Sequence, residues 1–275
     1  KMFKNILIIG CGMIGSSILR GAISKKICKK IYVFEKNTKF RNKIKKINKK
    51  IILIKKLDKK IKDMDFVVIS TPMSEYQKII NLLNKFLTNK TLITDVGSTR
   101  SNIAKLINEK LSKELNWIMS HPIAGSEASG PKYGSKILFK NKWCILIKRK
   151  NKKKLENKLV KFWKKLGSKV IFMHEQEHDK IFSVTSHLPH LIAYNLIKTA
   201  QDFQKNNKKN IIKYSAGGLR DFSRIAASNE IMWRDVLFNN SRNISKIIDL
   251  FIKNLKNFKI DINKKRNSSL INKLK

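Results

Sequence analysis

The sequence predicts an α/β fold, in which a Rossmann-type, doubly wound and mostly parallel sheet is followed by an all-α dimerisation domain. Short apolar runs alternate with helical segments along the first part of the chain, as buried parallel strands do in βαβ units. A glycine-rich motif stands between the first run and the first helical segment. After about Phe172 the strand-like runs stop and helical periodicity takes over. We therefore expect domains at residues 1–172 and 173–275.

Eight short apolar runs are expected to form the strands. Each run is continuous rather than alternating, which is typical of strands that are buried on both faces. The runs lie at residues 6–9, 31–34, 51–54, 66–69, 91–94, 117–119, 144–147 and 170–172. Small or polar residues follow three of them, at 70–72, 95–98 and 120–122. Because a doubly wound sheet binds ligands at the carboxyl ends of its strands, these three segments are candidate site loops.

The motif directly after the first run, Gly10 to Gly15, has the G-x-G-x-x-G spacing of dinucleotide-binding loops. Gly10 permits the tight turn, Gly12 lets the backbone approach a pyrophosphate, and Gly15 lets the next helix pack close to the strand. The phosphates would meet the positive end of the helix dipole. We expect the cofactor to be bound by Gly10, Gly12, Met13, Ile14, Gly15, Glu35, Ser70, Thr71 and Pro72. A glycine turn in a cofactor-free domain is the alternative.

Glu35, which closes the second strand, predicts NAD as the cofactor. A carboxylate at this place accepts hydrogen bonds from the ribose hydroxyls of NAD, whereas the extra phosphate of NADP would meet like charge. The sequence shows no arginine beside Glu35 that would hold this phosphate. Lys36 and Lys39 are near in sequence, so strict selectivity between NAD and NADP stays open.

The second half of the chain is expected to be nearly all helix. Residues 191–203, 231–238 and 244–258 show helical periodicity with broad apolar faces. Faces of this width bury against one another or against a partner subunit, so we expect a homodimer through the helical domain. The chain from Asn263 onward is polar enough to fray.

The charge composition of the chain limits which kinds of partner are expected. The 275 residues include 61 Lys or Arg and 19 Asp or Glu, which gives a net charge of +42. Such a charge raises the question of nucleic acid as a partner. However, 52 of the basic residues are lysines, scattered through nearly every predicted helix, so we expect no specific nucleic acid. A dispersed positive field still attracts small anionic substrates.

The cysteines and the hydropathy pattern indicate a cytoplasmic protein without a membrane partner. No apolar stretch approaches the length of a membrane span, and no signal-peptide pattern opens the chain. Cys11, Cys28 and Cys144 are odd in number, widely spaced and outside any C-x-x-C pattern. They are therefore expected to be reduced structural thiols rather than disulfides or zinc ligands.

His121 is the candidate base for dehydrogenation of an alcohol. It follows a predicted strand, at the edge of the sheet where the nicotinamide should lie. Imidazole has an unperturbed pKa of about 6.5, so it can accept a proton from a substrate hydroxyl while hydride leaves the same carbon. A strand-end histidine that is bonded only to backbone is the alternative.

Three arginines predict an anion-binding region. Arg220, Arg224 and Arg234 stand close together in a chain otherwise dominated by lysine. A planar guanidinium clasps a carboxylate by two bonds, which a lysine ammonium cannot do. The alternative is that these arginines pair with nearby acidic residues on solvated helix faces.

Several sequence blocks together resemble the family of prephenate dehydrogenases and the related arogenate dehydrogenases. The blocks are the glycine motif and residues 95–98 (DVGS), 121–127 (HPIAGSE), 186–190 (SHLPH), 221–226 (DFSRIA) and 232–235 (MWRD). The resemblance covers nearly the whole chain and implies an oxidoreductase of tyrosine biosynthesis. In the implied reaction NAD takes hydride from the ring carbon of prephenate that bears the hydroxyl, carbon dioxide leaves, and para-hydroxyphenylpyruvate forms. Arogenate, which would give tyrosine directly, is the alternative substrate.

The resemblance also implies roles for single residues. His121 looks like the base that polarises the substrate hydroxyl, Ser98 like its hydrogen-bonding neighbour, and Arg224 like the group that holds the ring carboxylate. His190 is implied as a further catalytic residue. The residues implied in substrate binding are Glu127, His187, Gly217, Asp221 and Trp233.

Three other functions are compatible with parts of the sequence. His174 and His178 stand in an H-E-x-x-H pattern, as zinc ligands do in metalloproteases. The segment is charged and has no obvious third ligand, so we expect a solvated linker or helix start and no metal.

Another two-domain reductase, such as a β-hydroxyacid dehydrogenase or pyrroline-carboxylate reductase, would use a lysine base and would leave the block around Arg224 unexplained. A nucleic-acid-binding protein would need a contiguous basic face, which scattered lysines do not predict.

Overall fold

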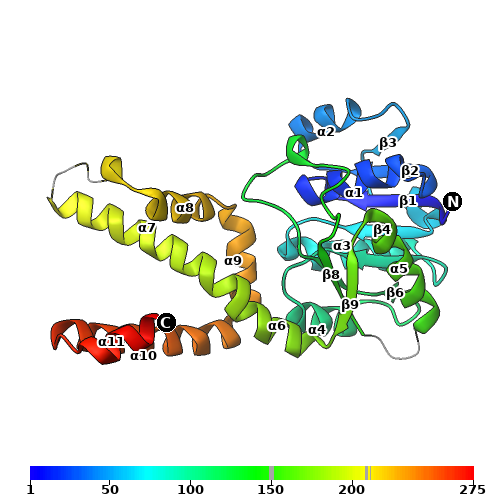
Figure 1. Cartoon of the computed structure of the whole chain (residues 1–275). Coiled ribbons are helices and arrows are strands. Elements are labelled where there is room, and N and C mark those ends of the chain that lie inside the picture. Colours follow the sequence, from blue (N-terminus) through cyan, green and yellow to red (C-terminus); the bar gives the residue numbers. More distant parts are fainter. Residues whose placement is uncertain (149–151, 208–209, 211) are drawn as a thin grey trace. The chain divides into compact units, whose positions relative to one another are not determined.

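The computed structural model describes residues 1–148, 152–207, 210 and 212–275 (Figure 1). The chain forms two compact units. Unit 1 comprises Lys1–His178 and Ala227–Asn239, and unit 2 comprises Asp179–Ala226 and Asn240–Lys275. The division of domains after residue 172 stays a prediction.

A six-stranded parallel sheet forms the centre of unit 1 and confirms the predicted doubly wound fold. Its strand order is β3-β2-β1-β4-β5-β6. The strands are β1 (Phe3–Ile9), β2 (Cys28–Phe34), β3 (Ile51–Ile54), β4 (Phe66–Ile69), β5 (Leu92–Asp95) and β6 (Asn116–Trp117). Residues 6–9 of β1 are fully buried, as the continuous apolar run predicts. The strand order reverses between β1 and β4, and such a point is where doubly wound sheets bind ligands.

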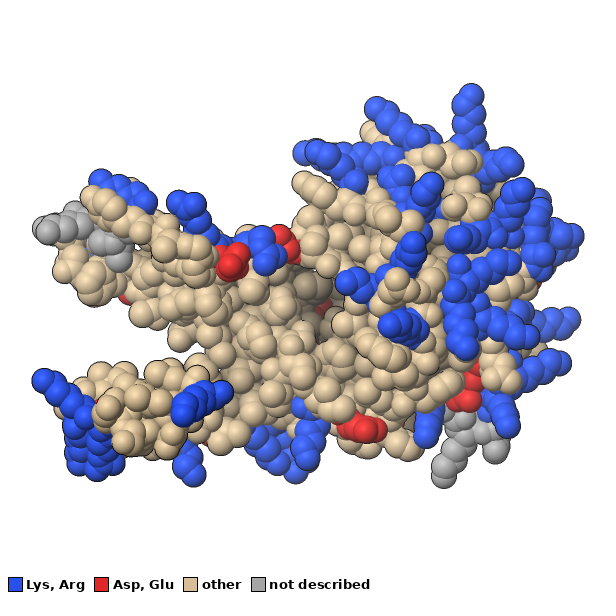
Figure 2. All heavy atoms as spheres, viewed as in Figure 1, with Lys and Arg blue, Asp and Glu red and all other residues tan. Residues whose placement is uncertain are grey.

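Among the described residues, seven α-helices contribute to unit 1. They are α1 (Met13–Ser24), α2 (Thr38–Lys45), α3 (Tyr76–Phe86), α4 (Ser101–Lys110), α5 (Lys153–Leu166), the start of α6 (Glu175–Phe182), and α9 (Glu230–Asn239). α2 begins after Asn37, whose side chain accepts the Phe40 N–H at 3.1 Å. Gly167 caps α5 directly after Leu166, and its φ of 103° is the left-handed conformation that favours glycine at this position. Figure 2 shows Lys and Arg side chains spread over the visible face of unit 1.

A second sheet corrects the expectation that all eight apolar runs join one sheet. It consists of β7 (Ser120–Pro122), β8 (Trp143–Ile147) and β9 (Lys169–Met173). β7 is antiparallel to β8, and β8 is parallel to β9. The predicted strand 117–119 is also wrong in its bounds, because the chain leaves the main sheet after Trp117 and Ser120 begins β7. His121 therefore lies within a strand, opposite Ile145, instead of in a loop after one.

Unit 2 is helical, as the periodicity predicts. It contains the end of α6, a π-helical turn at Ser183–His187, α7 (Leu188–Asn207), α8 (Gly217–Ala226), α10 (Ser241–Asn263) and α11 (Asn267–Leu274). α8 packs along α7, and α11 folds back on α10 (Figure 1). Pro189 follows the π turn, and its missing N–H opens the helical hydrogen-bond ladder there.

The expectation that the C-terminal end frays is wrong. Residues 267–274 form α11, and Asp261 of α10 accepts hydrogen bonds from Ser269 Oγ and Lys273 Nζ. Polar composition therefore did not prevent order here, because the polar groups bond to one another. In the described part of the chain, no helix combines the length and apolar character that a membrane span requires.

Candidate active site

The glycine motif forms a tight turn between β1 and α1. Gly10 has a φ of 81°, and a Cβ there would lie 2.7 Å from Thr71 Cγ2. A Cβ on Gly15 would overlap the Gly10 carbonyl oxygen. At Gly12, in contrast, no described atom outside the adjoining backbone lies within 4 Å of the place a Cβ would take. Two glycines are therefore required by packing, and the third leaves open space at the N-terminus of α1, which fits a pyrophosphate.

The loop after β4 borders this turn. Ser70 N–H donates to Ile9 O at 2.8 Å, and Ser70 Oγ donates to Gly10 O at 2.5 Å. Thr71 Oγ1 is buried and has no hydrogen-bond partner among the described residues. Pro72, the next residue, is exposed. A buried hydroxyl beside the glycine turn is a polar group that a bound ligand can satisfy.

Glu35 is held at the carboxyl end of β2. Its Oε2 accepts the Cys11 N–H and its Oε1 accepts the Asn37 N–H, both at 2.8 Å. The side chain is nearly buried. The carboxylate is therefore fixed beside the glycine motif, at the position from which Rossmann domains contact ribose.

The expectation that no arginine stands beside Glu35 is wrong. Arg41 Nη1 donates to the Glu35 carbonyl oxygen at 3.3 Å, because the first turns of α2 bring residue 41 back over the end of β2. Lys36 is drawn toward Glu75, whose pKa is lowered by the hydrogen bond from Lys36. Arg41 could not be assigned to this site from the sequence, because it stands six positions after Glu35 and only the fold brings the two residues into contact.

The segment that begins with His121 lies against the start of α1. A Cβ on Gly125 would lie 3.2 Å from Met13 Cε and 3.6 Å from Ile14 Cδ1. Ser126 Oγ lies 3.6 Å from Met13 Sδ. Met13 and Ile14 therefore link the nucleotide loop to this segment, which also carries the half-buried Glu127.

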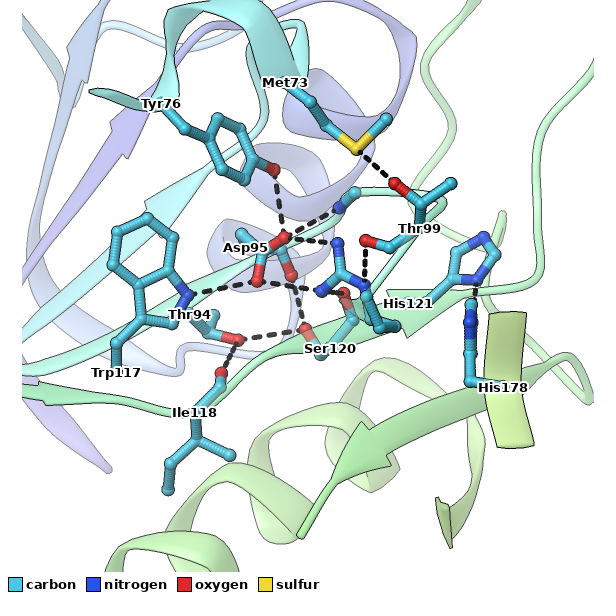
Figure 3. A network of polar contacts seen from close by, with 12 residues as sticks. Met73, Tyr76, Thr94, Asp95, Thr99, Trp117, Ile118, Ser120, His121 and His178 are labelled. Carbon is cyan, nitrogen blue, oxygen red and sulfur yellow. Dashed lines mark hydrogen bonds and ion pairs between the residues drawn. The ribbon is translucent and has the colours of Figure 1, made fainter. Parts of the chain in front are cut away.

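A buried ion pair is bonded to the strand that carries His121, and Figure 3 shows the polar network around its Asp95. Asp95 and Arg100 are both 0% exposed. Arg100 Nη2 donates to Asp95 Oδ2 at 2.8 Å, and Arg100 Nη1 donates to Asp95 Oδ1 at 3.1 Å. Tyr76 OH and Trp117 Nε1 also donate to this carboxylate, at 2.9 and 3.1 Å. Burial, together with the Asp95 charge, raises the pKa of Tyr76 well above its usual value, so its hydroxyl stays a donor.

The same ion pair fixes β7. Arg100 Nη1 donates to the Ser120 carbonyl oxygen at 3.3 Å, and Ser120 Oγ donates to the Asp95 carbonyl oxygen at 2.6 Å. A Cβ on Gly97 would overlap Arg100 Nη2, so the loop that carries the half-buried Ser98 needs glycine there. The network joins the DVGS block to the strand of His121. Sequence reasoning missed Arg100, although an arginine in a lysine-rich chain was the available signal.

His178 is a second residue that sequence reasoning missed. His121 Nδ1 and His178 Nε2 lie 2.8 Å apart (Figure 3). His178 is 0% exposed, so the expectation of a solvated segment is wrong for this residue. His174, which precedes α6, is exposed, and α6 does begin at Glu175 as a helix start. Within the described ranges, no three His, Cys, Asp or Glu side chains gather in a way that could hold a metal.

The two histidines of the SHLPH block lie in unit 2. His187 is 1% exposed, and its Nδ1 accepts from Asn240 Nδ2 at 3.1 Å. His190 Nδ1 donates to the Ser186 carbonyl oxygen at 2.9 Å, which leaves the lone pair on Nε2. Burial lowers the pKa of His190, more than its bond to Ser186 raises it, so the neutral form is favoured.

The remaining predicted residues are divided between the units. Gly217, Asp221 and Arg224 lie on α8 in unit 2, on its exposed side. Trp233, on α9, is 6% exposed and belongs to unit 1, with His121, Ser98 and Glu127. The structure thus brings the nucleotide loop, Ser98 and His121 into one unit, and the convergence of His121 with Arg224 stays a prediction.

Comparisons with known proteins identify two matching family models. The model of the prephenate dehydrogenase nucleotide-binding domain matches residues 21–172, and that of the prephenate dehydrogenase dimerization domain matches residues 174–275. Cyclohexadienyl dehydrogenase of Zymomonas mobilis is 30% identical over 95% of this chain and 89% of its own length. Prephenate dehydrogenase of Lactococcus lactis is 33% identical over 97% of this chain and 73% of its own.

A solved structure agrees with these relatives. The crystal structure of prephenate dehydrogenase from Aquifex aeolicus, in complex with hydroxyphenyl propionate and NAD+, has a TM-score of 0.90 and 31% sequence identity. The match covers 98% of this chain and 94% of that one. The similarity therefore extends over both units.

Proposed function

Because this chain belongs to the prephenate dehydrogenase family, we propose that it catalyses the NAD-dependent oxidative decarboxylation of prephenate to para-hydroxyphenylpyruvate. The observation that carries this proposal is the contact of Gly125 and Ser126 with Met13. It sets the segment of the candidate base against the nucleotide loop. The Aquifex relative binds NAD+ and a hydroxyphenyl acid, which is chemically similar to the proposed product.

The nucleotide loop fits the proposed cofactor. Gly12 leaves open space before α1, Thr71 offers a buried hydroxyl, and Glu35 is fixed at the ribose position. When bound, NAD+ supplies the hydride acceptor. The residues that would hold it are Gly10, Gly12, Met13, Ile14, Gly15, Glu35, Ser70, Thr71 and Pro72.

His121 would accept the hydrogen bond of the substrate hydroxyl and take its proton while hydride leaves the same carbon. Ser98 would form a hydrogen bond beside His121 and so link His121 to the side of the site where the nicotinamide lies. Loss of the ring carboxylate as carbon dioxide makes the ring aromatic, and the phenol oxygen recovers its proton. The polar groups must favour this charge movement without holding the departing carboxylate too tightly.

The residues that the family resemblance implies in substrate binding would hold the doubly anionic substrate. Arg224 would hold the ring carboxylate, while Asp221 and Glu127 position the guanidinium. His187, His190 and Gly217 would line the substrate pocket, with Trp233 near the side chain. The dispersed positive charge of the chain attracts such an anion.

The proposal includes a homodimer in the cytoplasm. α10 has 23 residues, of which only Ile244 and Asp261 are buried, so its apolar side chains need a further surface to cover them. Cys11, Cys28 and Cys144 are free thiols, as a reducing compartment permits. Burial raises the pKa of Cys11 and of Cys144, which keeps both protonated.

The test is an assay of the purified chain with prephenate or arogenate and with NAD or NADP, followed by nicotinamide absorbance. We expect the highest kcat/KM with prephenate and NAD. Higher kcat/KM with arogenate would replace the substrate but keep the reaction type. Absence of turnover with both substrates would overturn the proposed function.

A further inference from the structure

We propose that His178 is a positioning residue for His121, and that its Nε2 accepts a hydrogen bond from the Nδ1–H of His121. The inference rests on the proposed function for the role of His121, but its geometry does not. Both residues lie in unit 1. Their ring nitrogens are 2.8 Å apart, and their ring planes are inclined by 57°.

A distance of 2.8 Å requires one proton between the two nitrogens, because two facing lone pairs would repel. Two arrangements satisfy this condition. Either His121 Nδ1–H donates to His178 Nε2, or His178 Nε2–H donates to His121 Nδ1. The two arrangements give His121 opposite chemical properties.

The first arrangement is the one that a base requires. If Nδ1 of His121 holds the proton, Nε2 of the neutral ring carries the lone pair and can take the substrate proton. In the second arrangement, Nε2 would hold the proton and could only donate. Once His121 has accepted the substrate proton, its positive charge strengthens the bond from Nδ1 to His178. His178 thus favours the protonated form of the base that arises during the reaction.

Both partners are held from outside the pair. Ser120, the neighbour of His121 in β7, is bonded through its carbonyl oxygen to Arg100 and through its hydroxyl to the carbonyl of Asp95. His178 N–H donates to the carbonyl oxygen of His174, the residue before α6, at 3.0 Å. Ser101 Oγ, at the start of α4, donates to the Glu175 carbonyl oxygen at 3.2 Å. The beginning of α6 is therefore fixed to the same region of unit 1.

Burial strengthens the hydrogen bond between His121 and His178. His178 is 0% exposed, so water does not compete for its Nε2. The arrangement is that of a catalytic histidine oriented by a second acceptor, with a neutral imidazole in place of the usual carboxylate. A neutral acceptor fixes the tautomer without adding a buried negative charge.

The experiment compares His178→Leu, His178→Gln and His174→Leu in the full-length chain. Leucine removes the acceptor, glutamine offers an amide oxygen in its place, and His174→Leu changes the exposed histidine of the same H-E-x-x-H pattern. The first readout is the ¹⁵N spectrum of the histidine rings, with His121→Asn used to assign the signals of His121. This readout needs neither substrate nor cofactor.

We expect the neutral His121 ring to be protonated at Nδ1 in the wild type and in His174→Leu. The His178→Leu variant should show a mixture of the two tautomers, and His178→Gln should restore Nδ1 protonation. In turnover, His178→Leu should lower kcat about 10- to 100-fold with KM for NAD changed less than about twofold. His178→Gln should recover most of kcat, and His174→Leu should match the wild type.

Two results would overturn the proposal. One is protonation of Nε2 in the neutral His121 ring of the wild type, which needs no variant to fold. The other is a tautomer or a kcat that His178→Leu leaves unchanged. A wild-type protein without prephenate turnover would instead overturn the proposed function, while the spectrum would still decide the role of His178.

Discussion

At the scale of single residues, the proposed chemistry depends on side chains whose partners lie far away in sequence. His121 is bonded to His178, and Glu35 is bonded to the N–H of Cys11 and lies beside Arg41. The types of the candidate residues could be predicted from motifs, because each motif is a short stretch. Their partners could not, since tertiary folding brings them together.

Replacing His121 by asparagine tests the base. Asparagine is polar but has no nitrogen that takes a proton near neutral pH, so we expect kcat to fall about 10²- to 10⁴-fold. The dissociation constant of NAD, measured by fluorescence titration, should stay nearly unchanged because His121 lies outside the glycine turn. Unimpaired turnover would remove His121 from the mechanism.

Replacing Arg224 by alanine tests the anion-binding group. A charged hydrogen bond is worth about 1.5–3 kcal/mol, so we expect KM for prephenate to rise roughly 10- to 100-fold. Arg224→Lys should recover only part of this loss, because an ammonium cannot form two parallel bonds with a carboxylate. An unchanged KM in steady-state assays would assign the carboxylate to another residue.

At the scale of elements, buried polar contacts decide how strands and helices of unit 1 are joined. The Asp95–Arg100 pair links the end of β5 to β7, and Asp235 links α9 to the turn after β4 by accepting the Ser74 N–H at 3.0 Å. The strands and helices themselves follow from local periodicity. Their assembly into two sheets, with α9 in unit 1, depends on these long-range bonds.

Arg100→Met should destabilise the protein strongly. Methionine fills much of the volume but leaves the Asp95 carboxylate buried without its counter-charge, so we expect a loss of about 3–5 kcal/mol in the free energy of unfolding. The double variant with Asp95→Asn should recover part of this loss. Urea unfolding followed by circular dichroism measures both, and a loss below about 1 kcal/mol would show that the pair is not what holds β7.

Asp235 should make stability depend on acid pH. Burial raises the pKa of Asp235, but hydrogen bonds from Arg234 and Ser74 outweigh it, and the net pKa is lowered. Because its pKa is lowered in the folded state, ionised Asp235 stabilises the protein at pH values above its unfolded-state pKa of about 3.9. This stabilisation is lost as the pH falls through the folded-state pKa. Asp235→Asn should therefore lower Tm at neutral pH. In strong acid, the Tm difference between the variant and the wild type should become smaller. Parallel Tm curves across this range would contradict the assignment.

At the scale of the whole molecule, unit 2 leaves much apolar surface on α10 without cover. Leu250 and Leu255 are 50% and 51% exposed within the single chain. Apolar area of this kind on a two-turn stretch is typical of a subunit interface. This surface supports the proposed homodimer through unit 2.

Light scattering after size-exclusion chromatography tests the assembly. We expect a dimer for the wild type and dissociation toward monomer for the double variant Leu250→Asp and Leu255→Asp, because two carboxylates would be buried at the interface. Lys253→Asp, an added acidic group on the same helix at a lysine, is the control. A wild-type monomer at micromolar concentration would contradict the proposed dimer.

The sequence by itself determined the parallel sheet, the glycine turn, the helical second half and the family to which the chain belongs. These follow from continuous apolar runs, from helical periodicity and from short motifs, which the chain carries locally. Tertiary structure alone decided that the chain turns out of the main sheet after Trp117 and that Arg100 holds the strand of His121. It also decided that His178, in a pattern typical of zinc ligands, meets His121 instead. The physical reason is that buried polar groups need hydrogen-bond partners, and these partners come from distant parts of the chain. A local sequence pattern therefore does not predict which residue the partner is.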